Sequence, residues 1–239
     1  MSRRILAELI KVRTTRTALG FAAAVALLTL AIVLLGILAG DPATVPDKRS
    51  ALAVGSGLSA VLLLFGVVGA SAEYRHRTLA PALLVAPGRG RLLAARIVAY
   101  GLAGLGIGIV ATVVAFAIGI PLLAGRSGPD LGGSDYLRAG GGGLLTILLC
   151  TMLGVGVGTL VGRQVPAVIG AMNWMFVLEP LTGLIGHVSK FTVGQTATSL
   201  AGATGGDLLP WVGALLVQVA WTALFVLAGA LVDRRRDIA

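Results

Sequence analysis

Residues that could support catalysis or metal binding are few and far apart in this chain. The two histidines, His76 and His187, fall on opposite sides of a membrane in the topology derived below, so they cannot share a metal ion or supply a Ser–His pair within the bilayer. Cys150 is the only cysteine and lies in an apolar run, which excludes an internal disulfide and a Cys-based metal cluster. We therefore expect no catalytic residue and no metal ligand.

The sequence also has no phosphate-binding loop of the GxxxxGK[ST] type. The glycine cluster at 140–143 is the nearest approach, and no lysine follows it. We therefore expect that this chain does not bind ATP through such a motif and holds no cofactor of its own.

Polar side chains within the long apolar runs are the remaining candidates for a functional role. The main ones are Thr112, Thr151, Thr159, Asn173, Glu179, Gln218 and Thr222. An ion or sugar pathway normally needs more polar groups, so a hydrophobic or amphiphilic cargo fits better. Asn173, Glu179 and Gln218 are candidates for a gate or a cargo contact. For Glu179, which precedes Pro180 near the far leaflet, a structural role at the outer interface remains open.

Small residues recur at every fourth position of one apolar run. This stripe comprises Gly142, Thr146, Cys150, Gly154, Gly158 and Gly162. Such a stripe lets another helix approach closely. We expect Gly154, Gly158 and Gly162 to serve in helix packing, either within one subunit or between two subunits.

The composition places these residues in a membrane protein. Of 239 residues, 56% are hydrophobic and 12% are charged, and the mean hydropathy is +0.96. The net charge of +9 does not indicate nucleic-acid binding, because the Lys and Arg residues occupy the gaps between apolar runs instead of forming one patch. We expect an all-α polytopic membrane protein with a single transmembrane domain at 1–239.

Six transmembrane helices are predicted from the apolar runs. They cover about 18–39, 51–72, 97–124, 140–161, a fifth span that begins near 165 and breaks at Glu179 and Pro180, and 211–232. Residues 1–17 form an amphipathic interfacial helix. The gaps are a loop at 41–50, an irregular loop at 125–138, a tight turn at 162–166, and an extracytoplasmic segment at 187–210 with short helices.

The distribution of Lys and Arg predicts the orientation. Fourteen lie in the gaps on one side and five lie in the gaps on the other. Positively charged residues favour the cytoplasmic side, so both termini are expected in the cytoplasm of a multi-pass inner-membrane protein.

The segment 73–91 between the second and third spans is the most unusual stretch of the sequence. The stretch from Glu73 to Arg96 contains five Arg and two Pro, so it cannot cross a bilayer as a helix, yet its leucines allow it to fold against another surface. We expect a cytoplasmic docking element. Its candidate contact residues are Glu73, Tyr74, Arg75, Arg77, Thr78, Leu79, Leu83, Leu84, Pro87, Arg89 and Arg91.

With six spans, an amphipathic N-terminal helix, and E-Y-R-H-R-T followed by P-G-R-G-R-L-L-A-A-R, the whole chain resembles the permease subunits of type-2 ABC exporters, in particular actinobacterial ones. The matching residues are Glu73, Tyr74, Thr78, Pro87, Ala95 and Arg96, while Arg77 replaces the usual glycine. The resemblance implies a half-transporter that pairs with a second permease copy, identical or related. It also implies a coupling helix at about 77–85 that docks into a cytoplasmic ABC ATPase carrying ATP and Mg²⁺.

Two other functions remain open on the sequence. A secondary transporter or channel would need no ATPase, although the shortage of charge within the spans argues against it. A membrane scaffold or sensor would hold an ATPase without transporting anything.

Overall fold

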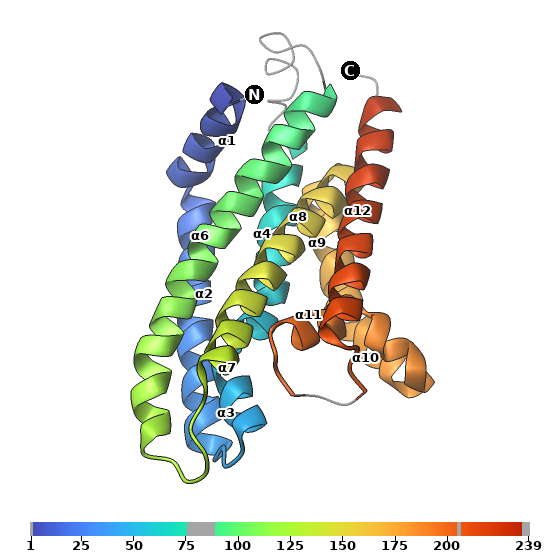
Figure 1. The fold of residues 1–239 in the computed structure, drawn as a ribbon. Helices are drawn as coiled ribbons and strands as arrows, with labels where there is room; N and C mark the ends of the chain where they lie inside the picture. The colour runs from blue at the N-terminus through green and yellow to red at the C-terminus, as the bar shows by residue number, and fades with distance from the viewer. Residues whose placement is uncertain (1, 76–88, 205–206, 236–239) are drawn as a thin grey trace.

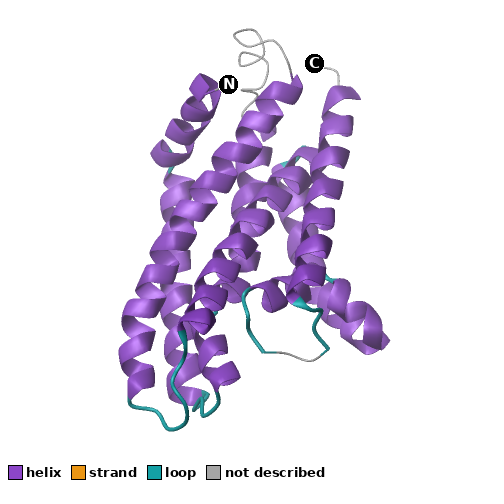
Figure 2. Ribbon diagram, viewed as in Figure 1, coloured by secondary structure: helices purple, strands orange, loops and turns teal. Residues whose placement is uncertain are grey.

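The computed structural model describes residues 2–75, 89–204 and 207–235, and within these ranges the chain is helical without any strand (Figures 1 and 2). The helices are α1 (Ser2–Thr14), α2 (Arg16–Leu34), α3 (Val45–Leu52), α4 (Val54–Arg75), α6 (Arg89–Ala124), α7 (Gly133–Leu137), α8 (Gly143–Val161), α9 (Gln164–Asn173), α10 (Glu179–Thr182), α11 (Val193–Leu200) and α12 (Trp211–Arg235). π-helical turns lie at Leu35–Ala39, Arg138–Gly142 and Trp174–Leu178, and a 3₁₀ segment lies at Gly183–Phe191.

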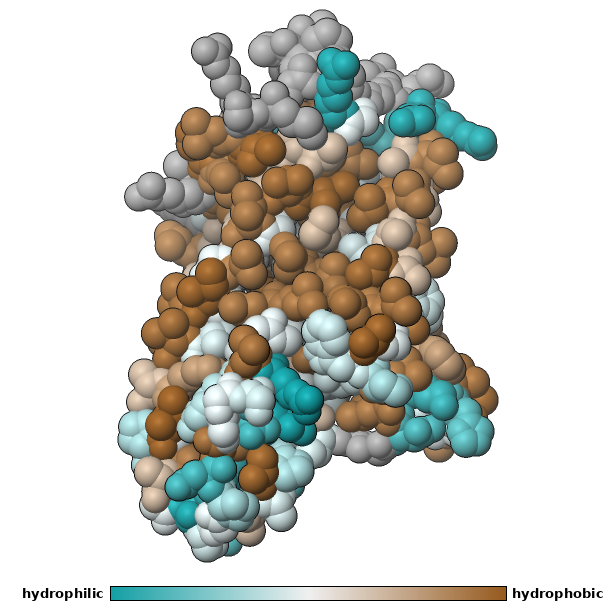
Figure 3. Space-filling view, viewed as in Figure 1, coloured by the Kyte–Doolittle hydropathy of each residue, from teal (hydrophilic) through white to brown (hydrophobic). Residues whose placement is uncertain are grey.

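Six helical stretches in the described ranges are long and apolar enough to cross a membrane, which confirms the predicted number. They are Thr17–Ala39, Val45–Ala72, Gly90–Ala124, Gly133–Val161, Gln164–Phe191 and Trp211–Arg235. Hydrophobic side chains cover the middle of the face seen in Figure 3, and hydrophilic ones gather at its lower end. This distribution is typical of a multi-pass membrane protein.

The bundle has two ends that differ in their connections (Figure 1). At the α1 end lie α1, the last turns of α4 and α12, and the first turn of α6. At the α3 end lie α3, α7, α10 and α11. The two ends are named in this way below.

Helices α4 and α8 pack together at the centre of the bundle. Leu58, Leu62 and Val67 of α4 are fully buried, as are Ile147 and Val155 of α8. Helices α6 and α12 each pack against α8 from its other sides. The central pair is therefore shielded from lipid by the remaining helices.

The expected loop at 41–50 is mostly helical, so this prediction was wrong. The Thr44 side chain caps the start of α3 by accepting a hydrogen bond from the backbone N–H of Asp47, and Pro46 fits the first turn because its missing N–H would be unpaired there anyway. Helix α3 joins α4 through Ala53, whose ψ of 56° is not helical. The second span therefore begins several residues earlier than the apolar pattern indicated.

The loop expected at 125–138 is also shorter than predicted. Helix α7 occupies Gly133–Leu137 and continues through the π-helical turn into α8, so the fourth span begins at Gly133. The backbone N–H of Gly132 donates a hydrogen bond to Asp135, which fixes the first turn of α7. Asp135, three residues after Gly132, thus starts the helix earlier than the sequence pattern indicated.

The fifth span does not break at Glu179 and Pro180, in contrast to the prediction. Leu178 and Glu179 keep right-handed helical dihedral angles, and the chain leaves the helical conformation only at Gly186, where φ is 66°. A wider turn directly before the proline gives its ring room that a regular α-helix lacks, since the ring would otherwise meet the carbonyl of the preceding turn. The π-helical turn at Trp174–Leu178 has this position.

Helix α1 packs against α6 at the α1 end. Val12 and Glu8 are buried in this contact, and Glu8 accepts a 2.8 Å bond from the ammonium of Lys11. Leu6 and Ile10 stay more than half exposed on another face. The helix thus packs one face against α6 and leaves Leu6 and Ile10 uncovered on another, and its position at a membrane surface stays a prediction.

Candidate functional site

The predicted docking segment lies between the last turn of α4 and the first turn of α6. Arg77, Thr78, Leu79, Leu83, Leu84 and Pro87 fall outside the described residues. Glu73, Tyr74 and Arg75 complete α4 and Arg89 begins α6, although the structure describes none of these four side chains. Arg91 is exposed on the first turn of α6. The structure thus fixes where the segment is attached.

The start of α6 lies against the end of α12. A Cβ placed on Gly90 would lie 3.7 Å from a guanidinium nitrogen of Arg234. Two turns further along α6, Arg96 is only 2% exposed, and Asp233 of α12 is also buried. Basic and acidic side chains are therefore partly enclosed at the α1 end, where the docking segment begins and ends.

Small residues of the predicted stripe join α8 to α4 within this subunit. A Cβ on Gly154 would overlap the carbonyl oxygen of Leu63, and a Cβ on Gly158 would crowd the carbonyl oxygen of Val67. Gly162 has a different role, because its φ of 67° ends α8 in the left-handed conformation that glycine adopts easily. Of the two readings left open, packing within one subunit accounts for Gly154 and Gly158.

Gln218 is fully buried at the junction of α8, α11 and α12. Its amide oxygen accepts a hydrogen bond from the Thr196 hydroxyl, and its amide nitrogen lies 3.3 Å from the Cys150 sulfur. The hydroxyl of Thr222, one turn along α12, donates to the backbone carbonyl oxygen of Gln218 within the same helix. The two side-chain contacts of Gln218 join α12 to α11 and to α8.

Asn173 directly precedes the π-helical turn at Trp174–Leu178, and Glu179 directly follows it. Asn173 is exposed on the surface of the bundle. Glu179 is partly buried, and its carboxylate accepts a hydrogen bond from the backbone N–H of Gly194 in the first turn of α11. The three candidates for a gate or a cargo contact therefore occupy three different surroundings.

An apolar pocket of about 230 Å³ lies between the fifth span and the helices packed against it, and it was not expected from the sequence. Its wall includes Ala171, Trp174 and Met175 from the fifth span, with Val193 of α11 and Phe225 of α12. The spacing of four residues between Trp221 and Phe225 indicates from the sequence that they share a helical face. The contact between Trp174 and Trp221 could not be predicted, because it forms only when the two helices pack together.

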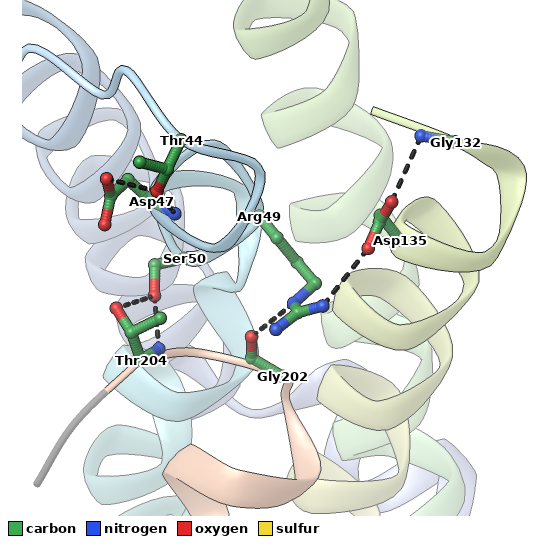
Figure 4. Close-up of polar contacts among 8 residues, drawn as sticks. All are labelled: Thr44, Asp47, Arg49, Ser50, Gly132, Asp135, Gly202 and Thr204. Atoms are coloured by element: carbon green, nitrogen blue, oxygen red, sulfur yellow. Dashed lines mark hydrogen bonds and ion pairs between the residues drawn. The ribbon is translucent and has the colours of Figure 1, made fainter. Parts of the chain in front are cut away.

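A polar cluster ties the connections together at the α3 end (Figure 4). The Arg49 guanidinium donates to the carbonyl oxygen of Gly202 at 2.8 Å and pairs with Asp135 at 3.1 Å. Ser50 bonds to Thr204 through its hydroxyl. Arg49 thus connects α3 with α7 and with the turn that follows α11.

Lys48 adds a second connection at this end. Its side chain is 1% exposed, and the ammonium donates to the backbone carbonyl oxygens of Arg126 and Gly128 at 3.5 and 3.3 Å. Lys48 and Arg49, with the partners of their side chains, form what is called the polar clasp below. Among the described residues, no group of three or more His, Cys, Asp or Glu side chains is arranged to hold a metal ion.

Comparison with known proteins adds no assignment to this picture. No family model matches the chain, and no curated protein matches it either. A function must therefore be argued from the residues and the fold.

Proposed function

We propose that this chain is the transmembrane permease subunit of an ATP-driven ABC exporter, which moves a hydrophobic or amphiphilic small molecule out of a bacterial cell. Energy comes from a separate cytoplasmic ATPase that binds ATP and Mg²⁺. The single observation that supports this most is the attachment of segment 73–91 to α4 and α6, two helices that both pack against α8. A partner that grips this segment would act directly on the centre of the bundle.

The proposed orientation puts the α1 end in the cytoplasm. Of the fourteen Lys and Arg residues of the more basic side, thirteen belong to α1, the start of α2, the segment at 75–96, the α8–α9 turn and the end of α12, and Arg236 lies outside the described residues. In this orientation both termini and the docking segment face the ATPase. The protein then spans the bacterial inner membrane with α3, α7 and α11 on the outer side.

A second permease copy is part of the proposal. Only 6% of the 18-residue apolar window of the fifth span is buried within the subunit, so most of its side chains face outward. Asn173 is among the exposed ones. A polar side chain at membrane depth is better placed against a protein partner than against lipid. Lipid and the second copy would share this surface, and no nucleic acid takes part.

The test is reconstitution of the chain with its ATPase in liposomes. We expect ATP hydrolysis and movement of a lipophilic cargo to need both proteins. The combined change Glu73→Lys, Leu83→Asp and Leu84→Asp should abolish co-purification of the ATPase and transport, because it reverses the charge and removes the apolar face of the docking segment. Normal co-purification and transport by this variant would refute the docking role.

A matched control carries the same kinds of change at the other end of the molecule. Asp130 and Leu137 are both exposed near α7, so Asp130→Lys with Leu137→Asp should leave ATPase binding intact. The same assay separates the other two functions. Cargo movement without the ATPase would indicate a secondary transporter or channel, and ATPase binding without any cargo movement would indicate a scaffold.

A further inference from the structure

The apolar pocket beside the fifth span has one charged neighbour. Its lining residues Ala167, Ala171 and Met175 recur every fourth residue along the span, and Glu179 is the next residue in this series. From the other side, Val193 of α11 lines the pocket, and the following residue, Gly194, donates its backbone N–H to Glu179. The carboxylate therefore lies at the edge of the pocket nearer the α3 end.

The negative charge of Glu179 is not balanced by a basic side chain. In the described part of the chain, no Lys, Arg or His nitrogen lies within 4.0 Å of it. The start of α11 offsets only part of a full charge. A hydrogen bond to Gly194 needs an acceptor oxygen but no charge, which glutamine would supply equally well. The packing thus explains an oxygen at this position and only part of its charge.

Aromatic rings form the wall of the same pocket. Trp174 and Phe225 line it, and Trp221 lies between them, with ring centroids 5.7 Å from Trp174 and 5.9 Å from Phe225. The indole N–H of Trp221 donates to the carbonyl oxygen of Phe191, which fixes this ring. Aromatic faces attract organic cations, and they do so more strongly where water is excluded.

We propose that this pocket binds an organic cation with an apolar body, whose positive group lies at Glu179 and whose apolar part lies against the pocket wall at Trp174 and Phe225. The inference rests on the proposed export function and names its class of cargo. The pocket, at about 230 Å³, is smaller than the roughly 300–1,000 Å³ of sites for drug-sized ligands, so it holds one arm of a larger cargo or a small cation.

The experiment measures binding to the purified chain in lipid nanodiscs, without ATPase and without ATP. The probes are phenethyltrimethylammonium and the uncharged analogue in which carbon replaces the quaternary nitrogen. Quenching of tryptophan fluorescence reports binding, because Trp174 and Trp221 lie at the pocket. We expect Glu179→Gln to weaken binding of the cation about tenfold, as expected for loss of a charge partner away from bulk water, and to leave the neutral analogue unchanged.

Two further variants complete the test. Asp130→Asn removes an exposed carboxylate far along the chain and should change neither probe. Gly170→Leu should weaken both probes, because Gly170 lines the pocket and a Cβ there meets open space, so the added side chain fills the pocket without disturbing the helix. Thermal unfolding of each variant checks that the fold is kept.

Three outcomes would overturn the inference. They are an absence of cation binding by the unchanged chain, equal cation binding by Glu179→Gln, and equal weakening of both probes by Glu179→Gln. The last would assign the pocket to neutral lipid and Glu179 to the start of α11 alone. Because the assay contains no ATPase, its failure leaves the export proposal standing with another cargo, and failure of reconstituted transport leaves the binding result standing.

Discussion

At the scale of single residues, buried polar groups in this protein join helices that the apolar pattern alone would not hold in register. Gln218 and Arg49 each contact two elements that are distant in the sequence, and Lys48 contacts the turn that follows α6. A hydrogen bond removed from such a place leaves a gap or an unpaired partner that water cannot easily reach. Stability should therefore be sensitive to these three residues.

We expect Gln218→Ala to lower stability by about 2 kcal/mol or more, since it removes the bond from Thr196 and leaves a cavity between three helices. Thermal unfolding in detergent measures the change. Leu216→Ala serves as the control, because Leu216 is 65% exposed on the same helix. Equal unfolding temperatures for the two variants would contradict the structural role of Gln218.

We expect Arg49→Met to loosen the α3 end without unfolding the bundle. The change removes the bonds to Gly202 and Asp135 while keeping an apolar stem of similar length. Hydrogen exchange should rise at 133–138 and 199–204 and stay unchanged in α4. Arg49→Lys should give an intermediate effect, because a single ammonium does not reproduce the two-sided contact of a guanidinium. Unchanged exchange in both segments would argue against the clasp.

At the scale of elements, the close contact between α4 and α8 depends on glycine residues from both helices. Gly66 of α4 lies against the carbonyl oxygen of Thr151, and Gly154 of α8 lies against that of Leu63, so the backbones touch from both sides. No side chain larger than hydrogen fits at either place. Such a seam depends on shape and on close van der Waals contact.

We expect Gly154→Leu to prevent formation of the folded monomer, because the new side chain would push α4 away from α8. The yield of monodisperse protein in detergent and its unfolding temperature measure this effect. Gly20→Leu is the matched control, since a Cβ at Gly20 meets nothing within 4 Å. A folded Gly154→Leu monomer that only fails to associate would show that the stripe acts between subunits instead.

Sequence patterns predicted the spans well because each needs about 20 apolar residues, and such windows are easily recognised. They missed α3 because its Asp47, Lys48 and Arg49 look like a loop until Thr44 caps it and Lys48 finds carbonyl oxygens far along the chain. They misplaced the break in the fifth span because Pro180 alone does not reveal that the preceding turn is widened. Contacts distant in the sequence support α3, whereas a local change of helical geometry keeps the fifth span continuous.

The residues of the candidate sites could be predicted to different degrees, because their bonding partners are distant in the sequence. Glu179 and Gln218 stand out as polar residues in apolar runs, but the bonding partners Gly194, Thr196 and Cys150 come from other helices. The pocket itself could not be predicted, since five separate helices and the π-helical turn contribute to its wall.

At the scale of the whole molecule, the proposed topology can be tested by labelling introduced cysteines. Cys150 is fully buried, so the unchanged protein should react slowly with maleimides. Asp130→Cys and Arg91→Cys place exposed thiols near opposite ends of α6. A membrane-impermeant maleimide should label Asp130→Cys in intact cells and label Arg91→Cys only after lysis. The reverse pattern would invert the topology and exclude a cytoplasmic docking segment.

The glycine-lined seam between α4 and α8 also limits how this molecule can move. Two helices whose backbones touch at Gly66 and Gly154 cannot rotate against each other without a clash, and separating them would lose close van der Waals contact, so we expect them to travel as one rigid body. The pocket at the fifth span lies on the border of that body, with Leu63 and Leu153 on one wall and Ala171 and Trp174 on the other. A force on the end of α4 would therefore move α4 and α8 together relative to the fifth span and change the width of the pocket.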